Sequence, residues 1–181
     1  MAFSPPISCA AARLLLLDDY YGGTFGMTRN GGTKKHTGVD IAATPGTELY
    51  AMYSGTVHMV QTKYNEDKYV KGSYGNEIVI NQYSHLHYRE PIAINPRTRL
   101  PFKEGDEVFE GDMIAYSGKT GNAYRDKDVP NKHLHLGVST DWQVSRRNNN
   151  WIDPAPFPNG TINVDKNHPY SGGTIDNIKC D

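Results

Sequence analysis

The stretch from Glu104 to Ala115 reads EGDEVFEGDMIA, in which a glycine turn leads into a short apolar strand and a second glycine turn. An earlier stretch, PGTELYAMYSGTV from Pro45 to Val57, follows a similar plan. Glycine readily adopts the backbone angles of tight turns, and short apolar runs between such turns are typical of strands. The repetition predicts a duplicated β motif within one domain.

A pattern of strand, turn and strand continues from Gly22 to about Thr140, without a sustained helical period. The 18 glycines and 11 prolines also favour many short elements joined by turns. We therefore expect an all-β fold of antiparallel sheets with few or no long helices. The predicted strands are residues 38–43, 48–60, 76–83, 113–117 and 133–140.

A length of 181 residues suits one domain with a core of its own. We expect an N-terminal arm over residues 1–21. The apolar run from Ala10 to Leu17 resembles part of a signal sequence, but Arg13 interrupts it, so we expect this run to be buried. Residues 22–142 would form the main domain. Asparagine, proline and glycine dominate residues 143–181, which predicts a loop-rich tail packed on that domain.

The charge balance limits the classes of partner. Lysine and arginine number 19 against 20 acidic residues, so the formal net charge is −1 and nucleic acid is not an expected partner. The sequence contains no run of about 18 apolar residues, so it does not predict a membrane span. The two cysteines, Cys9 and Cys180, lie near opposite ends, and whether they pair stays open. We expect a monomer.

Histidines cluster in three short segments. His36 and Asp40 are four residues apart and carry ordinary zinc ligands, although a surface pair is the commoner reading. His133 and His135 flank Leu134, and alternate residues on a strand point to one face, so both rings would emerge together. Two exposed histidines remain an alternative there. The third segment, His85-Leu86-His87, repeats the pattern.

The ordered set of these motifs resembles the lysostaphin-type (LytM-like, β-lytic) zinc endopeptidases, which act on bacterial peptidoglycan. The resemblance covers about two-thirds of the chain. It is carried by Phe25-Gly26, His36-x-x-x-Asp40, Pro45-Gly46-Thr47, Tyr74-Gly75-Asn76, Tyr83-x-His85-Leu86, the paired Gly-Asp turns, Ser117-Gly118-Lys119-Thr120-Gly121 and His133-Leu134-His135. The duplicated turns likewise resemble those of barrel-sandwich hybrid folds, and that resemblance supplies the name of the expected fold.

The resemblance implies a site with a single zinc ion. His36, Asp40 and His135 match the metal ligands of the family, and His133 and His85 match its two catalytic histidines. We assign the general base to His133 and oxyanion stabilisation to His85, roles that could be exchanged. The implied substrate is the peptide cross-link of peptidoglycan, and the implied location is extracytoplasmic: periplasmic, at the cell surface or secreted. Which cross-link is cut stays open, as does a bacterial or phage origin.

Other interpretations compete with this one. A phosphate-binding loop at Ser117 to Thr120 is rejected, because the required earlier glycine is replaced by Met113. A biotinyl or lipoyl carrier would need a modifiable lysine at a hairpin tip, and none is apparent. The serious alternative is a catalytically silent relative that binds cell wall or activates a hydrolase. The family usually has a hairpin between the strands that match residues 78–80 and 83–86, but only Asn81 and Gln82 separate them here. Either one strand runs on through this point, or the given chain omits a segment.

Overall fold

The computed structural model describes the parts of the chain that form the sheets and the histidine cluster. These are residues 6–7, 23–64, 70, 75–81, 85–88, 93–121, 133–141, 150–154, 161–164 and 173–176. They contain thirteen strands and no α-helix, and the pairings between strands are antiparallel. The prediction of an all-β fold is confirmed. No helix in these ranges is long and apolar enough to cross a membrane.

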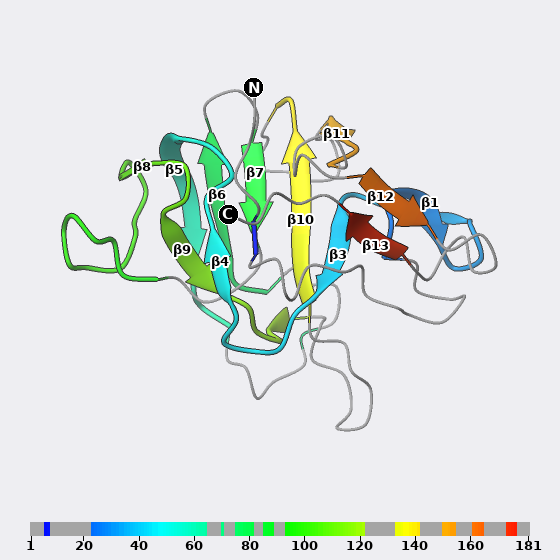
Figure 1. The fold of residues 1–181 in the computed structure, drawn as a ribbon, viewed down its shortest axis with the longest axis horizontal. Helices are drawn as coiled ribbons and strands as arrows, with labels where there is room; N and C mark the ends of the chain where they lie inside the picture. Colours follow the sequence, from blue (N-terminus) through cyan, green and yellow to red (C-terminus); the bar gives the residue numbers. More distant parts are fainter. Residues whose placement is uncertain are drawn as a thin grey trace.

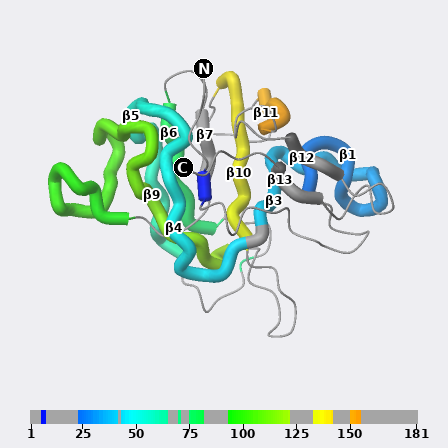
Figure 2. The backbone as a smooth tube through the Cα atoms, viewed as in Figure 1, coloured from blue at the N-terminus to red at the C-terminus, as the bar shows by residue number. Residues whose placement is uncertain are grey.

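One seven-stranded sheet forms the body of the molecule (Figure 1). Its strand order is β11-β10-β7-β6-β5-β8, and β3 pairs with β10 off this path. The strands are β3 (Val39–Ala42), β5 (Gly55–Gln61), β6 (Glu77–Asn81), β7 (His85–Tyr88), β8 (Glu107–Val108), β10 (His133–Ser139) and β11 (Trp151–Ile152). Because β10 has three partners, residues from distant parts of the chain meet along it, as the backbone trace in Figure 2 shows for β3 and β10.

A second, two-stranded sheet pairs β4 (Glu48–Tyr50) with β9 (Met113–Tyr116). It joins the two stretches in which the sequence repeats its glycine turns. Gly46 and Gly111, which precede β4 and β9, have φ values of 89° and 81°, a region where glycine meets no steric penalty. Leu49 and Ile114 of this sheet are buried in the same apolar cluster as residues of the large sheet, so the two sheets enclose one core.

The strand predicted over residues 48–60 divides into two, which corrects that prediction. β4 ends at Tyr50 and β5 begins at Gly55, and the chain passes from the small sheet to the large one between them. Ala51 still exchanges backbone hydrogen bonds with the 111–112 turn, and Met52 is fully buried. The apolar pattern alone could not reveal this crossing, because burial continues through it.

The connection near Gln82 differs from one alternative that the sequence suggested, a single strand that runs on. β6 and β7 pair antiparallel, with Ile80 opposite Leu86 and Ile78 opposite Tyr88. The chain therefore reverses between Asn81 and His85 and does not continue as one strand. The alternative of a missing segment stays open, because residues 82–84 lie outside the described part of the structure.

The sheet continues beyond the expected end of the main domain. β11 pairs with β10 through Trp151 and Ile152, so the start of the predicted tail belongs to the large sheet. Further along, β12 (Thr161–Val164) and β13 (Gly173–Asp176) pair antiparallel, so the predicted loop-rich tail also contains short strands. Turn-forming residues dominate the tail sequence and obscured these short strands.

The N-terminal arm is described at Pro6 and Ile7 only. Ile7 is fully buried and forms a β-bridge with Leu49, next to a hydrogen bond from the Tyr50 N–H to the Pro6 carbonyl. The apolar run from Ala10 to Leu17 and both cysteines lie outside the described residues.

Candidate metal centre

The register of β3 against β10 places His135 directly opposite Asp40. Leu134 pairs with Ile41 in the same ladder, and both of these side chains are fully buried in the core. Since successive side chains on a strand point to opposite faces, His133 and His135 share the face opposite to that of Leu134. The predicted strand geometry of the His-Leu-His segment is thus confirmed.

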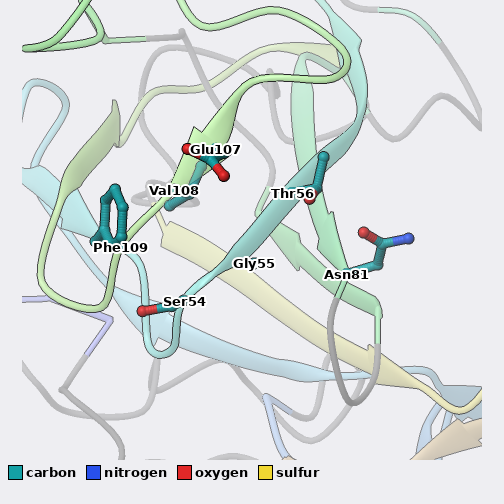
Figure 3. A pocket seen from close by; sticks show the side chains of 7 residues that line it. All are labelled: Ser54, Gly55, Thr56, Asn81, Glu107, Val108 and Phe109. Atoms are coloured by element: carbon teal, nitrogen blue, oxygen red, sulfur yellow. The ribbon is translucent and has the colours of Figure 1, made fainter.

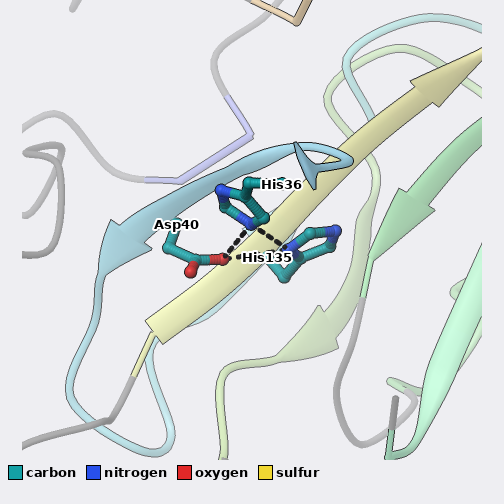
Figure 4. A group of neighbouring side chains, drawn as sticks. All are labelled: His36, Asp40 and His135. Atoms are coloured by element: carbon teal, nitrogen blue, oxygen red, sulfur yellow. Dashed lines mark hydrogen bonds and ion pairs between the residues drawn. The ribbon is translucent and has the colours of Figure 1, made fainter. Parts of the chain in front are cut away.

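Three side chains converge at this position, from β3, β10 and the end of β2 (Lys34–His36) (Figure 4). The distance from Asp40 Oδ1 to His135 Nδ1 is 2.9 Å, and that from Asp40 Oδ1 to His36 Nε2 is 3.2 Å. His36 Nε2 and His135 Nδ1 are 3.1 Å apart. One oxygen and two imidazole nitrogens therefore form a nearly equilateral triangle.

The cluster is shielded from solvent. His36 is 4% exposed, His135 is 2% exposed and Asp40 is fully buried. A charged carboxylate is costly to bury without compensating positive charge or hydrogen bonds. This burial rules out the interpretation of His36 and Asp40 as an ordinary surface pair.

A backbone carbonyl fixes the orientation of His36. Its Nδ1 lies 2.9 Å from the carbonyl oxygen of Thr24, which can only accept a hydrogen bond, so Nδ1 carries the proton. The Thr28 hydroxyl also donates to this carbonyl, at 2.8 Å. In neutral His36 the lone pair therefore resides on Nε2, the atom that faces Asp40 and His135. Such an outer hydrogen bond is characteristic of metal-binding histidines.

Gly38 permits the close approach of His135. A Cβ at Gly38 would lie 2.8 Å from His135 Nε2 and would also collide with the backbone oxygen of Leu136. No larger residue fits without moving the ring or the strand. The glycine between His36 and Asp40 thus has a steric role in the cluster.

Arg29 is a member of this site that the sequence interpretation missed. Its Nη2 donates a short hydrogen bond to Asp40 Oδ2 and lies 2.9 Å from His36 Nε2. Arg29 ends β1 (Gly26–Arg29), which forms a hairpin with β2. The motif Arg29-Asn30-Gly31-Gly32 indicates a turn. No local pattern indicates that the Arg29 side chain binds the carboxylate of Asp40, eleven residues further along the chain.

Opposing effects set the pKa of Asp40. Burial acts to raise it, since a dry environment disfavours the charged form. The positive charges of His133, His36 and Arg29, in that order, act to lower it. A hydrogen bond from His135 acts in the same direction. The net result is a pKa well below the usual value, so the carboxylate is ionised near neutral pH.

The donor set fits a zinc ion. Zinc binds nitrogen and oxygen at roughly 2.0–2.2 Å in tetrahedral geometry, which separates neighbouring ligand atoms by about 3.3 Å. The three separations of 2.9 to 3.2 Å are close to that value. The candidate ligand atoms also lie within 4.8 Å of one another as a group. Three ligands would leave one tetrahedral position for water, as in a catalytic site.

His133 lies beside the triangle. Its Nε2 is 3.4 Å from Asp40 Oδ1, and the residue is 9% exposed. The structure therefore brings His133 together with the three candidate ligands, on the same face of β10 as His135. An imidazole at this position is close enough to exchange protons with a group held by the cluster.

His85 occupies a different level of the sheet. Its backbone is opposite Ser139, six residues beyond His133 on β10, which corresponds to about 20 Å along the strand. His87 is opposite Gly137 in the same ladder. The side chains of both residues lie outside the described part of the structure. The backbone register nevertheless disfavours direct participation of His85 in chemistry beside His133.

A hollow of about 480 Å³ lies at the other edge of the large sheet (Figure 3). It is formed at β5, β6 and β8, whereas the histidine cluster is at β3 and β10. Its lining residues are Ser54, Gly55, Thr56, Asn81, Glu107, Val108 and Phe109. The lining includes no histidine and shares no residue with the cluster.

Comparison with known proteins identifies relatives of this fold. A family model described as Peptidase family M23 matches residues 34–154. The catalytic domain of the antimicrobial peptidase lysostaphin from Staphylococcus simulans is 26% identical, with a TM-score of 0.52, over 76% of this chain and 88% of that one.

Two further structures share the fold. A single-substitution variant of the catalytic domain of the prophage-encoded M23 protein EnpA from Enterococcus faecalis is 22% identical, with a TM-score of 0.52, over 84% of this chain and 95% of that one. A structure described as the antimicrobial peptidase lysostaphin from Staphylococcus simulans is 24% identical, with a TM-score of 0.50. The match covers 90% of this chain and 56% of that one.

Proposed function

The chain belongs to peptidase family M23, and on that premise we propose that it is a zinc-dependent endopeptidase that cleaves peptide cross-links of bacterial peptidoglycan. The observation that carries the proposal is the buried triangle of His36 Nε2, Asp40 Oδ1 and His135 Nδ1. These residues would hold one zinc ion. The similarity to the lysostaphin catalytic domain supports peptidoglycan as the substrate class.

The donor set suits hydrolysis. When bound, a zinc ion held by one carboxylate and two neutral imidazoles keeps a net positive charge, which polarises a carbonyl and lowers the pKa of water toward neutrality. Asp40 supplies the single negative charge, and its depressed pKa keeps it in the charged form that metal binding requires. The Thr24 carbonyl holds His36 in the tautomer that presents Nε2.

His133 is the proposed general base. Its ring is beside the ligand triangle and does not belong to it, with Nε2 3.4 Å from Asp40 Oδ1. It would accept a proton from the attacking water and then deliver a proton to the leaving amine. The oxyanion role that the family resemblance implies for His85 is a separate proposal, and the register of β7 weighs against it.

We further propose that the peptidase unit extends from about Gly22 to at least Ile152, because β11 completes the large sheet. The span of the family match, residues 34–154, supports this limit at the C-terminal side. The protein would act as a monomer outside the cytoplasm, where its substrate lies.

The test is release of soluble fragments from purified peptidoglycan. The zinc-loaded protein should release them, and chelation or the substitution His135→Ala should abolish release. His58→Ala is the matched control, since His58 is on β5, away from the cluster. Mass spectrometry of the fragments would identify the bond that is cut. If the folded, zinc-loaded protein binds peptidoglycan but releases nothing, the silent relative is correct and the enzymatic proposal is wrong.

A further inference from the structure

The two oxygens of the Asp40 carboxylate have different surroundings. Oδ1 faces imidazoles, with His135 Nδ1 at 2.9 Å, His36 Nε2 at 3.2 Å and His133 Nε2 at 3.4 Å. Oδ2 accepts the hydrogen bond from Arg29 Nη2. A carboxylate rotates freely about its terminal bond unless its oxygens are held, so the contact from Arg29 determines which oxygen is presented to the histidines.

Arg29 is held in place by its hairpin. The pairing of β1 with β2 has a register shift between Met27 and Arg29, and such bulges redirect side chains. Asn30 and Gly31 then turn the chain with positive φ values of 53° and 62°. The Arg29 side chain is 22% exposed beside a fully buried Asp40, so its guanidinium closes one side of the cluster against solvent.

The geometry points to Arg29 as the residue that positions Asp40 for metal binding, by holding Oδ2 so that Oδ1 is the single ligand oxygen. This inference rests on the proposed function, because it concerns the same metal site. Arg29 is a positioning residue and contacts neither metal nor substrate in this role. Outer hydrogen bonds of this kind orient ligands, and their loss typically weakens metal binding about 10- to 100-fold.

The charge of Arg29 has an opposite effect that must be separated from positioning. A guanidinium near a cation repels it, and Nη2 also touches His36 Nε2, a contact that metal binding has to release. If repulsion dominated, removal of the charge would strengthen metal binding. If positioning dominates, as we infer, removal weakens it. The sign of the change therefore decides between the two effects.

The experiment measures affinity for Zn²⁺ by competition with a chromogenic chelator, with no substrate present. Arg29→Met should weaken Zn²⁺ binding about 10- to 100-fold. Arg29→Lys, which retains a cationic donor, should recover part of the loss. The visible spectrum of the Co²⁺-loaded protein gives a second readout, because it reports ligand geometry. It should change in Arg29→Met and return toward the unsubstituted spectrum in Arg29→Lys.

The matched control is Arg97→Met. Arg97 forms a comparable pair with Asp112, with Nη2 2.5 Å from Oδ2. Its guanidinium also donates to the carbonyl of Glu107 on β8, which is at the opposite edge of the large sheet from β10. This variant should bind Zn²⁺ as the unsubstituted protein does. Unchanged or tighter Zn²⁺ binding by folded Arg29→Met would overturn the inference. Should that variant not fold, Arg29→Ala takes its place, and unchanged or tighter Zn²⁺ binding by folded Arg29→Ala would overturn the inference in the same way. If the unsubstituted protein itself fails to bind Zn²⁺, the proposed function fails instead.

Discussion

Asp40 and His135 face each other directly across two antiparallel strands, with Oδ1 2.9 Å from Nδ1. They are 95 residues apart in the chain, yet their relative position depends only on the register of β3 against β10. A shift of one residue in that register would move a ligand side chain to the other face of the sheet. The core pairs on that other face, Leu134 with Ile41 and Leu136 with Val39, therefore maintain the metal site.

The first prediction concerns Gly38→Ala. The added Cβ would lie 2.8 Å from His135 Nε2 and collide with the Leu136 backbone, so the ring or the strand has to move. We expect a loss of about 1–3 kcal/mol in the free energy of unfolding, typical of overpacking. Zinc affinity should fall as well, because His135 no longer meets Asp40. Urea unfolding and chelator competition measure the two effects.

Gly105→Ala provides the control for Gly38→Ala. Gly105 has a φ of 87° and open space around its Cβ position, so alanine there introduces backbone strain without touching the cluster. It should lower stability and leave zinc affinity unchanged. Equal zinc affinities for both glycine variants would contradict the steric role assigned to Gly38.

The second prediction concerns metal removal. A ligand that binds only the folded state stabilises it by about 2.7 kcal/mol at a free concentration 100 times Kd. For a chain of this size that corresponds to a rise in Tm of roughly 5–10 °C. Thermal unfolding with and without Zn²⁺ measures the shift. His135→Ala should remove the shift while remaining folded, and a full shift in that variant would show that zinc binds elsewhere.

Much of the fold follows from local patterns. The alternation of His133, Leu134 and His135 predicts a strand with both rings on one face, and β10 has this arrangement. The glycine turns before β4 and β9 were likewise foreseeable, because each requires a positive φ. Strand ends were less predictable, since burial continues where the chain leaves β4 for β5.

The composition of the site depends on long-range register, which local patterns do not determine. The pairing of Asp40 with His135 was expected from family resemblance and could not be inferred from spacing. Arg29 was missed because a bulge in a short hairpin directs it toward Asp40. For His85, motif matching suggested a catalytic role, whereas the β7 register places its backbone at another level of the sheet.

The third prediction compares two histidines. His133→Ala should lower kcat/KM by about 10²- to 10⁴-fold, the usual contribution of a general base, while zinc content stays unchanged. His85→Ala should leave kcat/KM near that of the unsubstituted protein, because its backbone is opposite Ser139. Peptidoglycan cleavage assays with metal analysis test both variants. A large loss in His85→Ala would restore the oxyanion role, and full activity in zinc-loaded His133→Ala would refute the assignment of the base.

The fourth prediction concerns the pH dependence of stability in the metal-free protein. The pKa of Asp40 is well below the usual value of about 3.9 that applies in the unfolded chain. As the pH falls below about 3.9, the unfolded state takes up a proton at this residue before the folded state does. The contribution of Asp40 to stability is therefore present above that pH and is lost as the pH falls toward the folded-state pKa.

Urea unfolding between pH 6 and pH 3 should accordingly show a steeper loss of stability in the unsubstituted protein than in Asp40→Asn. Carbon NMR of the carboxyl group gives a direct measurement that does not depend on the folding of a variant. The Asp40 resonance should still report an ionised group at a pH near the ordinary aspartate pKa of about 3.9. Titration of Asp40 near that ordinary value would contradict the compensation of its charge by the surrounding histidines and Arg29.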